Sequence, residues 1–192
     1  MLNQGETMKR TLPGLLLFGA FLLAAPPVFA QEPAPAPSPG AAKELLAAWN
    51  REGGKLVAMA EDFPEEKYDF KPTPDVRSFG EHLLHVAEFI RRINAAAKGE
   101  APAKEELTHE KYKTRAEVAA VVKQAFADGA AVIEATDTGG LGKEVKSPFG
   151  NRKVTLQGLW TGALVAAGEH YGSLVVYYRL SGMVPPASRR QN

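Results

Sequence analysis

AAGEHYGSLVVYYR, residues 166–179, is the stretch that decides the fold of this 192-residue chain. Apolar residues recur at helical spacing through it and in the residues before it, so they share one face of a helix. They are Leu156, Trp160, Ala163, Ala167, Leu174 and Tyr177. His170 falls on the same face, where a histidine is either a hydrogen-bonded core residue or a ligand. The pattern predicts a core helix that carries one inward histidine.

A second inward histidine, His85, lies far upstream in the stretch EHLLHVAEF. Ser78 and Glu81 have the spacing of a capping box, which predicts a helix from there to about Lys98. Its main apolar stripe consists of Phe79, Leu83, Val86, Ile90 and Ile93. An adjoining stripe consists of His82, His85 and Phe89. So wide an apolar surface indicates contact with two neighbouring elements.

Two further helices complete the pattern. Apolar residues at helical spacing predict a first helix that starts at Ser38. In the connection that follows it, Pro64, Pro72 and Pro74 prevent helix through Asp75. Thr114 and Glu117 form a second capping box, which starts another helix that stops before Gly139. The stretch GKEVKSPFGNRKVT then predicts a short hairpin-like loop, followed by the last helix up to about Leu180. Four amphipathic segments without convincing strands predict an all-α four-helix bundle with long loops between the helices.

Composition limits the classes of function. Hydrophobic residues make up 45% of the chain and charged residues 23%, which are values of globular proteins. A net charge of +1 gives no reason to expect nucleic acid or an anionic membrane as a partner. The chain has no cysteine, which excludes disulfides, thiolate metal sites and a cysteine nucleophile.

The first thirty residues have the features of a secretory signal peptide. Lys9 and Arg10 precede an apolar run at 12–25, which is short for a membrane span. Small residues at positions 28 and 30 predict cleavage before Gln31. We therefore expect export to the periplasm or the extracellular space, with no membrane association once the signal is removed. An uncleaved anchor is the alternative.

The remaining boundaries follow from composition. Residues 31–40, QEPAPAPSPG, predict an extended Pro/Ala-rich linker. The helical domain is then expected over 41–186, and 187–192 form a short basic tail. Either Met1 or Met8 can be the start of the chain.

Two stretches resemble the DinB-like superfamily of four-helix-bundle proteins. FPEEKYDFKPTPDVRSFGEHLLHVAEF is similar to the connection between its first two helices and the start of its second. EHYGSLVVYYRLSGMVPP is similar to its last core helix and to a C-terminal signature common in exported bacterial members. The resemblance implies a bundle that often holds zinc or nickel. It implies one histidine ligand on the second helix, here His85, and an H-x-x-x-H pair on the last helix, whose second member is His170.

This chain departs from that pattern at the first member of the pair, where it has Ala166. Alanine cannot ligate a metal, so we expect the protein to purify with little metal. Glu88 or His82 is the possible third ligand, because each lies within one turn of His85. In the alternative interpretation the two histidines are buried and neutral, and hydrogen-bond to each other, to Glu88 or to a tyrosine hydroxyl.

Two kinds of function follow. One is a metal-dependent enzyme, either a hydrolase or a thiol-dependent transferase, with an unidentified small molecule as substrate. The other is a non-catalytic module, possible also as a homodimer, that binds a small ligand or a partner and has lost the metal. No glycine-rich phosphate loop or nucleophile elbow is present. His109 lies in a polar loop, where we expect it to be solvated.

Overall fold

A computed structural model describes residues 38–190. The expected signal peptide, residues 31–37 of the expected linker and the last two residues of the tail lie outside these residues.

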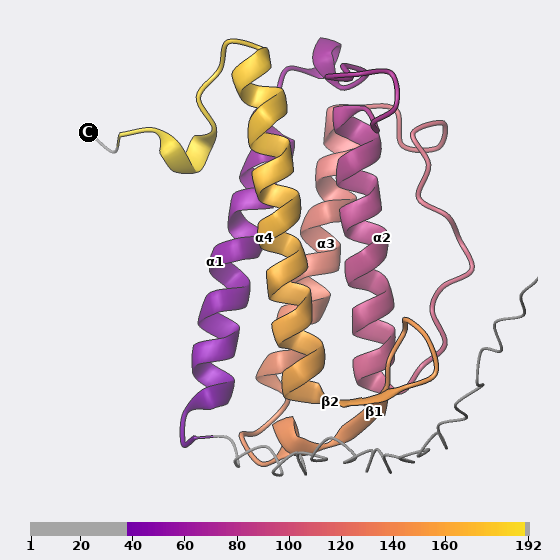
Figure 1. Cartoon of the computed structure of the whole chain (residues 1–192), viewed down its shortest axis with the longest axis vertical. Helices are drawn as coiled ribbons and strands as arrows, with labels where there is room; N and C mark the ends of the chain where they lie inside the picture. Colours follow the sequence, from indigo (N-terminus) through magenta and orange to yellow (C-terminus); the bar gives the residue numbers. More distant parts are fainter. Residues whose placement is uncertain (1–37, 191–192) are drawn as a thin grey trace, which may run out of the picture. The chain divides into compact units, whose positions relative to one another are not determined.

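Within the described residues the chain forms the expected all-α four-helix bundle (Figure 1). Its long helices are α1 (Ala41–Asp62), α2 (Phe79–Lys98), α3 (Arg115–Glu134) and α4 (Leu156–Leu180). Three short 3-10 helices, η1 (Glu65–Lys67), η2 (Gly140–Gly142) and η3 (Pro186–Ser188), lie in the connections and the tail. β1 (Glu144–Lys146) and β2 (Lys153–Thr155) pair antiparallel, which confirms the predicted hairpin.

Side-chain caps define most helix starts. In α2 the Ser78 amide donates to Glu81 Oε2 at 2.6 Å and the Glu81 amide donates to Ser78 Oγ at 3.3 Å, which confirms the capping box. The Thr114 box is present in α3, and Thr155 caps α4. The start predicted for the first helix is wrong by three residues. Gly40 has the left-handed backbone (φ 91°) that ordinary helical residues do not adopt, so α1 begins only after it.

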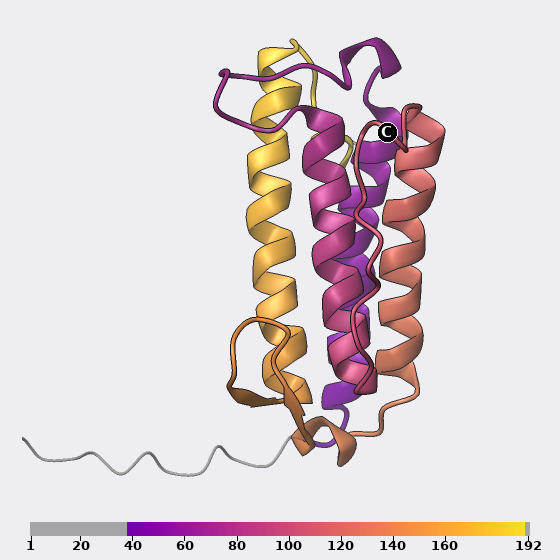
Figure 2. The same ribbon diagram turned by 90° about the vertical axis from the view of Figure 1, so that its right-hand side faces the viewer.

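The helices do not alternate in direction along the chain. α1 and α4 run one way, and α2 and α3 run the other (Figures 1 and 2). Because α2 and α3 are parallel, residues 99–114 run back along the length of the bundle to connect them. Leu107 is buried and fixes this crossover to the rest of the protein.

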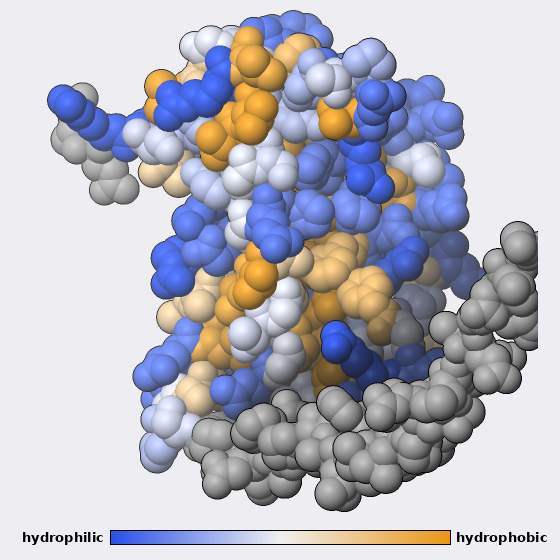
Figure 3. All heavy atoms as spheres, in the orientation of Figure 1, coloured by the Kyte–Doolittle hydropathy of each residue, from blue (hydrophilic) through white to orange (hydrophobic). Residues whose placement is uncertain are grey.

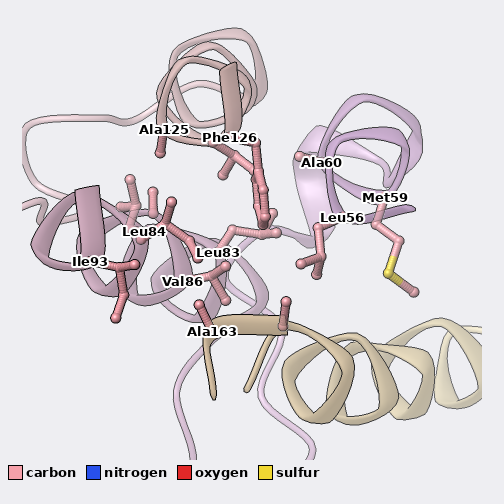
Figure 4. Close-up of a cluster of buried hydrophobic side chains, with 14 of the residues drawn as sticks. Leu56, Met59, Ala60, Leu83, Leu84, Val86, Ile93, Ala125, Phe126 and Ala163 are labelled. Atoms are coloured by element: carbon pink, nitrogen blue, oxygen red, sulfur yellow. The ribbon is translucent and has the colours of Figure 1, made fainter. Parts of the chain in front are cut away.

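All four helices contribute to one core (Figure 4). Trp49 and Trp160 are fully buried with ring centres 5.1 Å apart, edge to face. Close approach of α1 and α3 depends on Gly53, because a Cβ there would lie 2.6 Å from the Phe126 ring. Its neighbour Gly54 faces open space. The predicted apolar face of the last helix is confirmed, since its six apolar residues are all buried.

The end of the chain packs back onto α1. Tyr178 Oη donates to Asp62 Oδ2 at 3.2 Å, and Arg189 Nη1 donates to Asp62 Oδ1 at 2.8 Å. One carboxylate thus ties α4 and the first residues of the basic tail to the end of α1.

The outer side of α4 is unusually apolar. Val165, Val176 and Leu180 are exposed on it, and Figure 3 shows apolar surface, in orange, over the side of the bundle where α4 lies. Within residues 38–190, none of the helices combines the length and the apolar character that crossing a bilayer requires.

Candidate functional site

Three histidines meet between two helices. His82 and His85 come from α2 and His170 comes from α4. His82 Nε2 lies 3.0 Å from His170 Nδ1, and these two rings have centres 5.1 Å apart. The rings of His85 and His170 have centres 5.3 Å apart, as the expected shared site requires. We call these three residues the histidine cluster.

Helix geometry explains the cluster. His82 and His85 are three residues apart, so they lie one turn apart on the same side of α2, next to the stripe that enters the core. On α4, Ala167 and Leu174 are buried on either side of His170 in sequence. The three histidines are only partly buried, because they lie where the apolar α2–α4 contact meets the surface.

Aromatic rings surround the cluster. The Tyr177 ring lies 5.9 Å from the His82 ring, centre to centre, and the Tyr177 hydroxyl donates to the Arg77 carbonyl at 2.6 Å. On the other side Phe89 lies 6.3 Å from His170 and stacks on Phe149 of the hairpin. The loop before α2 and the hairpin before α4 therefore both border the cluster.

The environment keeps the imidazoles neutral. Burial, together with the neighbouring His170, His85 and Arg77, lowers the pKa of His82 from 6.5 to about 4. Burial and the charge of Arg77 lower the pKa of His85. Burial also lowers the pKa of His170, against the opposing effect of Glu169. All three side chains are therefore unprotonated at pH 7, which is the form that ligates metals.

An open groove of about 1260 Å³ borders the cluster. It lies between residues 71–77, the crossover residues 107–110, and parts of α2 and α4 that include His82, His85 and Tyr177. We call it the histidine groove. It is large enough to accept a small organic molecule.

The possible third ligands differ in their surroundings. The carboxylate of Glu88 forms an ion pair with Arg92. His82 contacts His170 directly, and Ala166 brings no donor atom. Of the two candidates, His82 is therefore the one that already lies against a predicted ligand.

The donor set fits zinc or nickel in kind, since neutral imidazole is a preferred ligand of both. With zinc–nitrogen bonds of about 2 Å, two imidazoles on one tetrahedral ion have ring centres roughly 5 Å apart. The separations of His82 and His85 from His170 match this value. As the side chains stand, no three His, Asp or Glu residues of the described part converge on a single point where an ion would sit. Binding would therefore require rotation of the side chains.

The expectation that His109 is solvated is wrong. Its side chain is 19% exposed, and its Nδ1 lies 3.1 Å from Asp69 Oδ1. Its Nε2 is buried without a hydrogen-bond partner among residues 38–190. The buried Leu107 holds this part of the crossover against the bundle, and a leucine within a polar loop was the signal in the sequence.

Comparisons with known proteins agree with this architecture. A sequence model of the DinB superfamily matches residues 48–173. A DinB-like protein from Bacillus cereus ATCC 10987 superposes with a TM-score of 0.64 at 13% identity, over 75% of this chain and 95% of its own. One from Bacillus subtilis gives 0.61 at 23% identity, over 77% and 99%. No curated protein matches the chain significantly.

The matched residues extend from α1 to α4 and make up well over half of the chain. The chain therefore belongs to the DinB superfamily, as the two sequence stretches indicated.

Proposed function

We propose that this DinB-superfamily protein binds one divalent cation, zinc or nickel, through His82, His85 and His170, next to a groove that accepts a small molecule. The observation that supports the proposal is the gathering of three neutral imidazoles from two facing helices at the edge of the histidine groove. Neutral imidazole is the commonest metal ligand in proteins.

His82 is the ligand by which this proposal differs from the pattern that the family resemblance implies. Since residue 166 is alanine, the H-x-x-x-H pair implied by the family resemblance is incomplete. His82, one turn before His85, replaces the missing donor from the opposite helix. The ligands would then be two histidines of α2 and one of α4, which is the reverse of the family arrangement.

A bound cation in such a site acts as a Lewis acid on a substrate or lowers the pKa of bound water or a thiol. The residues of this chain would hold the cation, keep one side of it open to the groove beside Tyr177 and exclude water from the other side with Phe89. A metal-dependent hydrolase or a thiol-dependent transferase fits this arrangement.

One contact favours the second candidate, a non-catalytic binding module. His82 and His170 lie at hydrogen-bonding distance, so each satisfies a polar atom of the other without any metal. In that case the groove alone would carry the function, as a site for a small ligand.

Metal titration separates the two candidates. Purified protein is stripped with a chelator and titrated with zinc and nickel by calorimetry, beside His82→Gln, His85→Gln, His170→Gln and, as a control, His109→Gln. We expect one ion per chain, and at least about tenfold weaker binding in each of the first three variants. An unchanged affinity in those three, or no binding to the wild type, would favour the non-catalytic module.

Export and self-association remain proposals as well. N-terminal sequencing of protein from the extracytoplasmic fraction should give Gln31 as the first residue. An intact Met1 or Met8 on soluble cytoplasmic protein would contradict export.

A further inference from the structure

The side chain of Arg77 lines the histidine groove, and no carboxylate of residues 38–190 forms an ion pair with it. The other basic side chain of the lining, Lys71, is bound to Glu81 at 3.1 Å. Nearby Arg92 is bound to Glu88. The guanidinium of Arg77 takes part in none of the ion pairs and side-chain hydrogen bonds formed within the described residues.

The backbone of Arg77 is fixed although its side chain is exposed. Its carbonyl accepts the hydrogen bond from Tyr177 Oη at 2.6 Å, which ties it to α4. The next residue, Ser78, is the buried N-cap of α2. Arg77 is therefore held between the two helices that carry the histidine cluster.

The charge of Arg77 acts on the cluster. Burial lowers the pKa of all three histidines, and the charge of Arg77 acts in the same direction. Burial raises the pKa of Tyr177, and the charge of Arg77 opposes that effect. Asp75 and Glu110 also line the groove and form no ion pair within residues 38–190, and they do not affect the histidines. Glu88 and Glu169 oppose the lowering of the pKa of His85 and of His170, respectively. Among the described residues, Arg77 is therefore the basic side chain of the lining that is left without an ion pair next to the cluster.

We infer that the histidine groove binds a small molecule with a carboxylate group, which Arg77 holds while the rest of the molecule lies against the histidine cluster. The planar guanidinium offers two parallel N–H donors that match the two oxygens of a carboxylate. One free positive charge balances a carboxylate better than a phosphate dianion, because Lys71 is already neutralised. Val76, Leu107 and Val176 on the lining suit an apolar part of the ligand.

The inference rests on the proposed function in taking the groove as the ligand site, and it does not require the metal. Its test uses benzoate as the probe and neutral benzamide as the matched control. Because the chain has four histidines, their imidazole proton signals can be assigned with single variants and followed by NMR. Wild type, Arg77→Gln, Arg77→Lys and the control Arg179→Gln, whose residue is exposed on α4 outside the groove, are titrated with each probe.

We expect benzoate to shift the signals of the histidine cluster in the wild type and to bind roughly tenfold or more tightly than benzamide, since a charge-assisted pair is lost with the amide. Arg77→Gln should reduce the affinity for benzoate to that for benzamide, and Arg77→Lys should restore part of the difference in affinity. Arg179→Gln should behave as the wild type. Equal binding of the two probes, or benzoate binding unchanged in Arg77→Gln, would overturn the inference.

The two proposals can fail separately. Each titration is run with a chelator and again with zinc. If zinc does not bind but benzoate still depends on Arg77, the metal proposal fails and the carboxylate inference stands. If zinc binds through the histidines and Arg77→Gln leaves benzoate binding unchanged, the carboxylate inference fails alone.

Discussion

His82 Nε2 lies 3.0 Å from His170 Nδ1, across the contact between α2 and α4, although the two residues are 88 positions apart in the chain. One imidazole must donate and the other accept, so at most one of the two can be protonated without losing this contact. We propose the same two nitrogens as ligands of the divalent cation. The protonation state of this pair therefore affects both the stability of the bundle and the binding of the proposed metal.

The first prediction concerns pH. The pKa of His82 is about 4 in the folded protein against an ordinary 6.5, so the unfolded chain binds a proton in this range more readily than the folded one. This group therefore has no effect on stability above pH 6.5 and reduces stability as the pH falls from 6.5 towards 4. With a chelator present, the melting temperature of the wild type should drop by a few degrees more than that of His82→Gln between pH 7 and 5. Parallel pH profiles of the two proteins would contradict this.

The second prediction compares two adjacent glycines of α1. A Cβ on Gly53 would lie 2.6 Å from Phe126, so Gly53→Ala should lower the free energy of unfolding by about 1–3 kcal/mol. Gly54 faces open space inside the same helix, so Gly54→Ala should raise it by up to about 1 kcal/mol. Urea unfolding of both variants measures the difference. Equal effects would show that α1 and α3 do not approach closely at Gly53.

The third prediction concerns Trp160, which is fully buried against Trp49. Trp160→Ala should cost about 3–5 kcal/mol in chemical unfolding. Trp160→Phe should cost clearly less, because it keeps an aromatic ring and removes a buried indole N–H that has no partner among the described residues. A loss below about 1 kcal/mol for the alanine variant would place Trp160 outside the core.

The fourth prediction concerns position 166, one turn before His170 on α4. If His82 replaces the donor that Ala166 lacks, then Ala166→His should restore zinc binding to a protein that also carries His82→Gln. Addition of zinc should then raise the melting temperature of the double variant, because binding to the folded state stabilises it. Val165→His in the same background is the control, since Val165 is 58% exposed on another side of the helix. Rescue by both substitutions, or by neither, would contradict the proposed geometry.

Much of the fold could be predicted from local signals. The capping residues Ser78 and Thr114 each form the hydrogen bonds that their spacing predicts, because a cap depends only on residues within one turn. The first helix start was missed since Ser38 looks like a cap, whereas the backbone of Gly40 decides where the helix begins.

The site was predicted less completely, because it depends on how distant segments pack. The pairing of His85 with His170 was expected from their inward faces together with the family resemblance. The direct contact of His82 with His170 depends on the rotation of α2 about its axis, which periodicity does not give. The partial burial of His109 depends on the course of the crossover, which a single leucine in a polar loop indicates but does not specify.

The central claim is that His82, His85 and His170 bind one divalent cation. X-ray absorption at the zinc edge, on protein loaded with one equivalent of zinc, tests it most directly because the spectrum counts imidazole ligands. We predict three imidazole nitrogens at about 2.0 Å in the wild type and two in His82→Gln. A wild-type spectrum without imidazole ligands, or one that His82→Gln leaves unchanged, would contradict the claim.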